Sequence, residues 1–172
     1  MAERSVVKVW YPESEERLPS HQGSHSFLDY CLKVKPKGEL GGREYFPVEK
    51  LMSWLGNIMI LEYLPDADDF RYRLYGSEIA SRSGFDMTGK CVSDFHSVMG
   101  DIFRAQYLKA VEERCLIVSR NPYLHSRAPC DWERIICPVT DGKKIQLVVS
   151  NYMVDLSGDV VTEQPGSHSY PK

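Results

Sequence analysis

The spacing of apolar and polar positions predicts two helices near the start of the chain. Apolar residues recur at helical intervals over 24–34, with Ser24 or Ser26 as the expected N-cap. A second, shorter apolar stripe predicts a helix over 47–55. The preceding residues 1–23 are polar and interrupted by prolines, so we expect an irregular arm there.

The period then changes to that of a β-hairpin. The run Asn57–Leu64 is almost continuously apolar and is typical of a central strand. In Phe70–Tyr75, apolar and charged residues alternate, which places Phe70, Tyr72 and Leu74 on one face, toward the core. A short polar turn joins the two runs, so we expect antiparallel pairing.

A segment interrupted by glycines and one long helix follow the hairpin. Residues 76–95 predict short helices, the first of them capped by Ser77. The apolar stripe over Val98–Arg114 predicts the longest helix of the chain. Three strand-like runs close the pattern: Leu116–His125, Trp132–Val139 and Ile145–Val154.

This element order predicts an α+β domain. We expect a five-stranded antiparallel sheet with helices inserted between strands two and three, preceded by N-terminal helices. The expected organisation is an arm over 1–23, a helical extension over 24–55, the domain over 56–155 and a flexible tail over 156–172. Inserted helices over one sheet face leave room for a small ligand between the two layers. The residues expected to line that space are Met59, Leu61, Tyr72, Leu74, Ile79, Phe95, Phe103, Tyr107 and Val149.

Composition narrows the expected partners and location. The 172 residues carry a formal net charge of −3, so there is no basic excess for binding nucleic acid. No apolar run reaches the length needed to cross a membrane, and no signal-peptide stretch opens the chain, so we expect a cytoplasmic protein. The five cysteines form no C-x-x-C pair, which argues against a disulfide framework and a thiolate metal site.

The segment 70–90, FRYRLYGSEIASRSGFDMTGK, resembles a family of bacterial PAS-like proteins of largely unassigned function. In that family a Gly-Arg-Asp-Leu-Thr-Gly-like turn follows the hairpin, and here Phe85 stands in place of the arginine. The run Trp132–Ile135 and the turn Asp141–Gly142 also match. The resemblance covers the chain from Trp54 to about residue 154 and implies a PAS fold. Domains of that fold bind haem, flavins, organic acids, metals, partner proteins or nothing detectable.

No cofactor can be assigned from the sequence. Haem would require a pocket histidine, but His96 precedes the long helix and His125 ends a strand. Flavin photochemistry would require a cysteine in a specific motif, and Cys91 lacks that context. Haem and flavin therefore have no motif support, and no metal site is expected.

Two arginines of the hairpin suggest a charged surface. Arg71 and Arg73 share one strand face, where they would either hold an anion or pair with acids such as Glu62 or Glu133. We favour the pairing, since alternate charges on a strand are typical of its solvent side.

These observations lead to a hypothesis of function. We expect a PAS-like sensory module, not an enzyme, that binds a small ligand under the inserted helices. It would signal as a homodimer, through the N-terminal helix and the sheet face, or through a separate signalling partner. A ligand-free interaction or dimerisation module is the alternative, and a small cone-fold enzyme is a third reading.

Overall fold

A computed structural model describes residues 8–10, 19–95, 97–123 and 130–155, which form a mixed α+β fold. Apart from the first two strands, which the sequence did not predict, the described helices and strands follow the predicted order. They are β1 (Lys8–Trp10), α1 (Gln22–Val34), β2 (Gly41–Gly42), α2 (Val48–Leu51), β3 (Ile58–Leu64), β4 (Asp69–Tyr75), α3 (Ser77–Ser83), α4 (Val98–Glu112), β5 (Ile117–Tyr123), β6 (Cys130–Thr140) and β7 (Ile145–Asp155). A 3₁₀ turn, η4 (Val92–Asp94), lies between α3 and α4.

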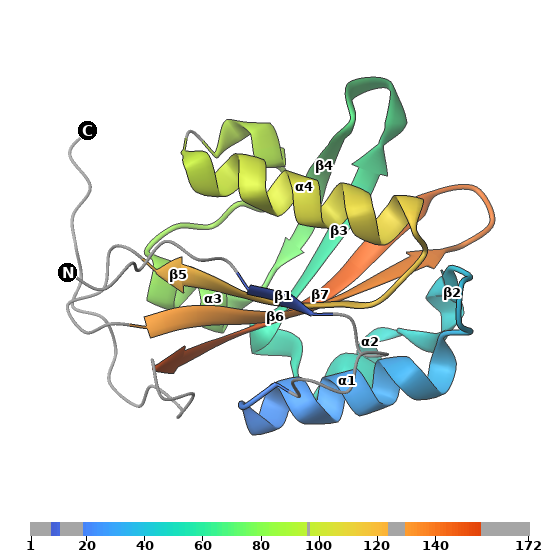
Figure 1. Cartoon of the computed structure of the whole chain (residues 1–172), viewed down its shortest axis with the longest axis horizontal. Coiled ribbons are helices and arrows are strands. Elements are labelled where there is room, and N and C mark those ends of the chain that lie inside the picture. Colours follow the sequence, from blue (N-terminus) through green and yellow to red (C-terminus); the bar gives the residue numbers. More distant parts are fainter. Residues whose placement is uncertain (1–7, 11–18, 96, 124–129, 156–172) are drawn as a thin grey trace.

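The strands form one sheet in the order β1-β5-β6-β7-β3-β4, with β2 beside the end of β6 (Figure 1). All neighbours along this path are antiparallel, and β2 pairs with β6 in parallel. The five strands predicted from the sequence are β3 to β7. The last of them, β7, lies between β6 and β3, which joins the opening hairpin to the closing strands.

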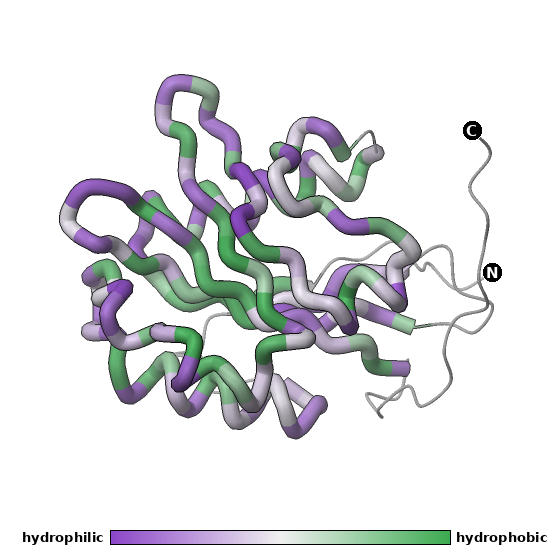
Figure 2. Tube along the Cα trace, turned by 180° about the vertical axis from the view of Figure 1, so that it is seen from behind, coloured by the Kyte–Doolittle hydropathy of each residue, from purple (hydrophilic) through white to green (hydrophobic). Residues whose placement is uncertain are grey.

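Helices cover both faces of the sheet, because the strands present apolar side chains in both directions. Figure 1 shows α4 over one face, the α4 face, and α1 with α2 over the other, the α1 face. Each face has its own buried cluster, and the strands between them are largely apolar while the hairpin tips are polar (Figure 2). Phe27, Leu28 and Cys31 bury the apolar side of α1 against the sheet.

The strand β4 contains a bulge that changes which side chains share a face. Leu61 lies opposite Tyr72, but the next residue, Ile60, lies opposite Leu74, which leaves Arg73 as the extra residue. Phe70 and Tyr72 therefore belong to the α4 face, whereas Leu74 packs on the α1 face. The prediction that these three share one face is wrong for Leu74, since a bulge reverses the alternation beyond it.

A second segment lies along the outer edge of β4. The Tyr72 N–H donates to the Lys90 carbonyl at 2.9 Å, and the Gly89 N–H donates to the Tyr72 carbonyl at 2.7 Å. Arg71 and Cys91 are paired as an isolated antiparallel bridge. The loop after α3 thus occupies hydrogen-bonding groups at the middle of this edge strand.

Several local predictions are corrected by the structure. Residues 8–10, expected to be irregular, form β1 and pair with β5. The N-cap of α1 is His21, whose ring accepts a hydrogen bond from the Gly23 N–H, and neither Ser24 nor Ser26 caps the helix. The first inserted helix follows Gly76, so Ser77 lies inside it. The predicted tail over 156–172 lies outside the described residues.

Candidate ligand-binding site

The predicted lining residues lie together on the α4 face, with one exception. Phe95, just after η4, is partly buried against the cluster of this face. Leu74 lies on the α1 face and does not face the space under α4 as predicted, because of the bulge at Arg73. The other members of the set are buried in the α4-face cluster: Met59, Leu61, Tyr72, Ile79, Phe103, Tyr107 and Val149.

Aromatic rings connect the sheet, the inserted turn and α4. Phe70 packs edge-on against Tyr107, with ring centroids 5.5 Å apart. Phe85 and Phe95 are 5.3 Å apart, and Phe95 lies 5.8 Å from Phe103 of α4. Such edge-to-face contacts add to the stabilisation from apolar burial, so the inserted helices share one aromatic layer.

A buried polar network fixes α4 on β5. The Gln106 amide donates to Asn121 Oδ1 at 2.8 Å, and the Ser119 hydroxyl donates to Gln106 Oε1 at 2.9 Å. The Asn121 amide donates to Ser119 Oγ at 3.1 Å, which closes the triangle. All three side chains are buried, and each forms hydrogen bonds with the other two. These bonds offset the free-energy cost of removing the polar groups from water.

Beside this network lies a buried cation. Arg134, on β6, is 4% exposed. Its Nε donates to Asn151 Oδ1 and its Nη1 to the Tyr107 hydroxyl, each at 3.3 Å. The guanidinium carbon lies 3.6 Å from the centre of the Phe103 ring. Within the described residues no carboxylate forms an ion pair with Arg134, so its partners there are neutral.

Two further hydroxyls near Arg134 stay protonated at neutral pH. Burial raises the pKa of Tyr75 to about 12, against the opposing effect of the Arg134 charge. Burial raises the pKa of Tyr72 well above its usual value, and Arg134 again opposes that rise. Protonated phenols donate hydrogen bonds. The α4 face therefore combines one fixed positive charge with neutral donors in an apolar surrounding.

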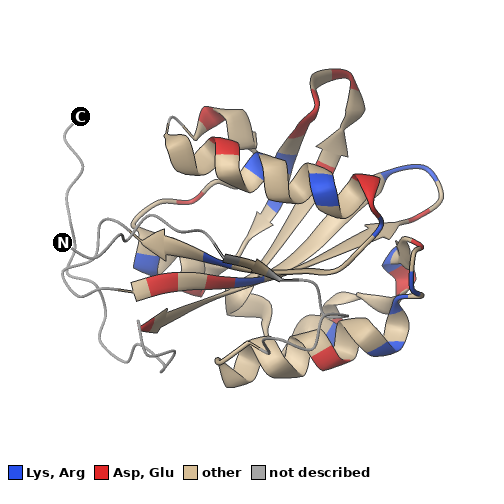
Figure 3. Cartoon of the chain, in the orientation of Figure 1, with Lys and Arg blue, Asp and Glu red and all other residues tan. Residues whose placement is uncertain are grey.

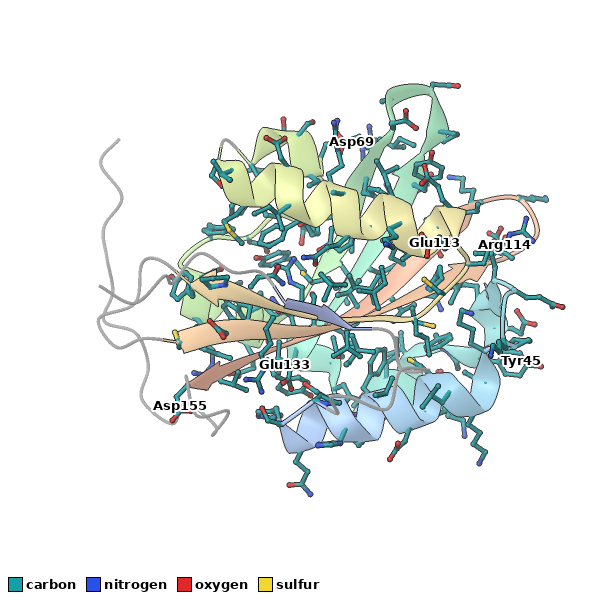
Figure 4. The ribbon with its side chains drawn as sticks, in the orientation of Figure 1. Tyr45, Asp69, Glu113, Arg114, Glu133 and Asp155 are labelled. Carbon is teal, nitrogen blue, oxygen red and sulfur yellow. The ribbon has the colours of Figure 1, made fainter. Side chains whose placement is uncertain are left out.

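The preceding residue, Glu133, lies on the α1 face (Figure 4). It is fully buried and accepts hydrogen bonds from the backbone N–H groups of Ser20 and His21, at 2.9 and 3.0 Å. Arg120 forms an ion pair with it at 3.0 Å. Burial opposes ionisation of the Glu133 carboxyl, but these donors outweigh burial and lower its pKa. Glu133 thus attaches the chain just before α1 to the sheet.

The hairpin arginines behave as surface groups. Arg73 lies 3.7 Å from Glu62, which also binds Lys144 at 2.7 Å, as predicted for a solvent-side pairing. Glu133, proposed from the sequence as another partner of these arginines, binds Arg120 on the α1 face instead. Figure 3 shows charged residues at the hairpin tips and along α4. The ion pair with Glu62 accounts for Arg73 without a bound anion.

Arg134 is not among the lining residues predicted from the sequence. A signal was present, since alternation along the predicted strand puts Trp132, Arg134 and Ile136 on one face. Apolar residues on both sides of an inward-facing charge would have marked that position. Charged residues stand on both faces of this strand, Arg134 on one and Glu133 on the other, and both are buried. The alternation therefore does not distinguish a solvent face from a core face.

The described part of the chain offers no cluster of three or more His, Cys, Asp and Glu side chains suited to hold a metal ion. His96 and His125, considered as haem ligands, lie outside the described residues. Cys137 is buried and Cys115 is partly buried. The N–H of Cys91, the residue before η4, donates to the Asp94 carboxylate at 2.8 Å.

In the ranges that the structure describes, no helix has the length and apolar character to cross a bilayer. Comparisons with protein-family models, curated proteins and solved structures found no match to this chain.

Proposed function

We propose that this chain is a PAS-like sensory module that binds a small ligand between the sheet and the inserted helices. The strand arrangement supports this proposal, since β7 lies beside β3 and the helices inserted between β4 and β5 cover one sheet face. Helices inserted over one sheet face leave room for a small ligand between the two layers, as expected from the sequence.

The observation that carries the proposal is the buried charge of Arg134 on the α4 face. A core that served only stability would be apolar there, because burying a charge without a carboxylate is costly. Polar groups that converge in an otherwise apolar interior are typical of ligand sites.

The same strand offers a route from the site to the N-terminal helix. Arg134 faces α4, while Glu133 binds the backbone at Ser20 and His21 on the opposite face. A ligand that moved β6 would therefore act on the attachment of α1. Signalling requires that the ligand binds one packing of these elements more tightly than the other. The receiver would be a second copy or a separate partner.

Native mass spectrometry of the purified protein tests this function. We expect a co-purifying small molecule at one per chain, and an absorbance spectrum that identifies or excludes haem and flavin. Binding should also increase protection of α1 and α4 against hydrogen exchange. A chain without any bound molecule, and without a response to a library of small metabolites, would contradict the proposal.

A ligand-free interaction module is the second candidate, and exposed apolar residues favour it. Leu32 of α1, Val48 of α2 and neighbouring Met52 are exposed by 50%, 57% and 64%. Because Phe27 and Cys31 are buried within the chain, a homodimer through this side would use the exposed set. Light scattering would detect the dimer, and Met52→Glu should dissociate it, whereas Lys50→Glu in the adjoining helix α2 is the control.

A further inference from the structure

We propose that the guanidinium of Arg134 anchors the carboxylate of a small organic acid whose body is apolar. This inference rests on the proposed function and specifies the ligand class for the same site.

The charge of Arg134 is not neutralised by the described residues, whereas that of a neighbouring arginine is. Arg120 of β5 has an ion pair with Glu133 at 3.0 Å, although its side chain is 17% exposed. Arg134 is more buried and pairs with no described carboxylate. A guanidinium cannot lose its proton in a protein, so it must keep its charge in this position. An anion that enters the site would supply the missing charge.

The donors of Arg134 are only partly used. A guanidinium has five N–H groups in a planar fork that matches a carboxylate. Two hydrogen bonds join it to described residues, Asn151 and Tyr107, and both are 3.3 Å long. Charge-assisted bonds to carboxylates are shorter, at about 2.7–2.9 Å. The described residues therefore leave donors for a ligand carboxylate to occupy.

The surroundings indicate a single carboxylate on an apolar body. Phe103 covers one face of the guanidinium, with its ring centre 3.6 Å from Cζ. Tyr72 and Tyr107 are buried beside it in a cluster of apolar side chains. One fixed positive charge balances a monoanion, and the desolvation of a phosphate dianion would need further cations. The neighbouring phenols can donate to the second carboxylate oxygen.

The test compares acids with their neutral amides. Acetate, hexanoate and benzoate, and the matching amides, are titrated against ligand-stripped protein while the melting temperature is followed. We expect at least one acid to raise Tm by roughly 3–6 °C at ten times its Kd, while its amide has no effect. Arg134→Met should abolish this rise, whereas Arg71→Met, at an exposed position of β4, should keep it.

Different results separate this inference from the proposed function. If an amide binds as well as its acid, if phosphate alone binds, or if Arg134→Met binds the acid unchanged, the anchor is wrong and the ligand site stands. If neither acids nor amides bind and native mass spectra show no bound molecule, both are wrong. Should Arg134→Met not fold, the NMR signal of the Arg134 Nε–H in the wild-type protein replaces it. A shift with benzoate supports the anchor, and no shift on saturation excludes it.

Discussion

Arg134 and Glu133 are neighbours along β6, have opposite charges and are both buried, yet they lie on opposite faces of the sheet. The pleat of the strand prevents them from neutralising each other. Glu133 is neutralised by Arg120, and Arg134 has only neutral described partners. One strand thus carries a charge paired with an opposite charge under α1 and a charge with neutral described partners under α4.

Arg134→Met should not destabilise the ligand-free protein. Arg134→Met removes a buried, unpaired charge and keeps an apolar chain of similar length. We expect the free energy of unfolding in urea to stay unchanged or to rise by up to about 2 kcal/mol. Arg71→Met, on the exposed side of β4, should change it by less than about 0.5 kcal/mol. A loss of more than about 2 kcal/mol for Arg134→Met would identify Arg134 as a structural residue.

Glu133→Gln should have the opposite effect on stability. It leaves Arg120 without its buried carboxylate, and breaking such a pair costs about 3–5 kcal/mol. Hydrogen exchange should speed up at the start of α1, because Ser20 and His21 lose a charged acceptor. Glu113→Gln, which removes the exposed pair with Lys109, is the control and should cost less than about 0.5 kcal/mol. Equal effects of the two substitutions would refute the role given to Glu133.

Stability should fall in two steps as the pH decreases. Burial lowers the pKa of His21 below its usual 6.5, so the unfolded chain binds its proton first and stability declines as the pH drops below that value. The pKa of Glu133 is lowered from its usual 4.5 in the folded protein, so its ionised form stabilises the fold at a pH above 4.5. This stability is lost as the pH falls through the folded-state pKa. Chemical denaturation from pH 8 to pH 3 measures both. His21→Gln should remove the first step, and Glu133→Gln should reduce the second.

Much of the fold follows from periodicity, and the remainder depends on tertiary contacts. Alternation and apolar runs identify β3, β4 and the closing strands because each element repeats one pattern over its length. The bulge at Arg73 interrupts β4 without any change in its alternation, so pairing with β3 is needed to reveal it. The cap at His21 is equally hidden, since its geometry depends on Glu133, more than a hundred residues away.

Cysteine labelling should follow burial. Cys91 is partly exposed and should react first with iodoacetamide, followed by Cys115, whose thiol pKa is raised by burial and by nearby Glu113. Cys31, Cys130 and Cys137 are buried and should react only as the protein unfolds. Peptide mass spectrometry over time gives the order, and urea should equalise the rates. Early labelling of Cys31 would show that α1 separates from the sheet in the native state.

A close backbone contact predicts one further sensitive position. A Cβ on Gly76 would lie 2.2 Å from the Gly56 carbonyl oxygen, which rigid backbone cannot accommodate. Gly76→Ala should therefore destabilise the protein by about 2–3 kcal/mol in urea denaturation. Ser77→Ala, one residue further and exposed, caps no helix and should cost less than about 0.5 kcal/mol. Unchanged stability of Gly76→Ala would contradict a close contact between Gly76 and Gly56.

The loop segment along β4 has a consequence for self-association in crowded solution. An uncovered edge strand invites strands of other molecules to extend the sheet into fibres. Here Gly89 and Lys90 already form hydrogen bonds with the backbone N–H and C=O of Tyr72. The twist added by the bulge at Arg73 makes the outer edge of β4 a poor template for a further strand. A polymer that grew from this edge would first have to displace that segment.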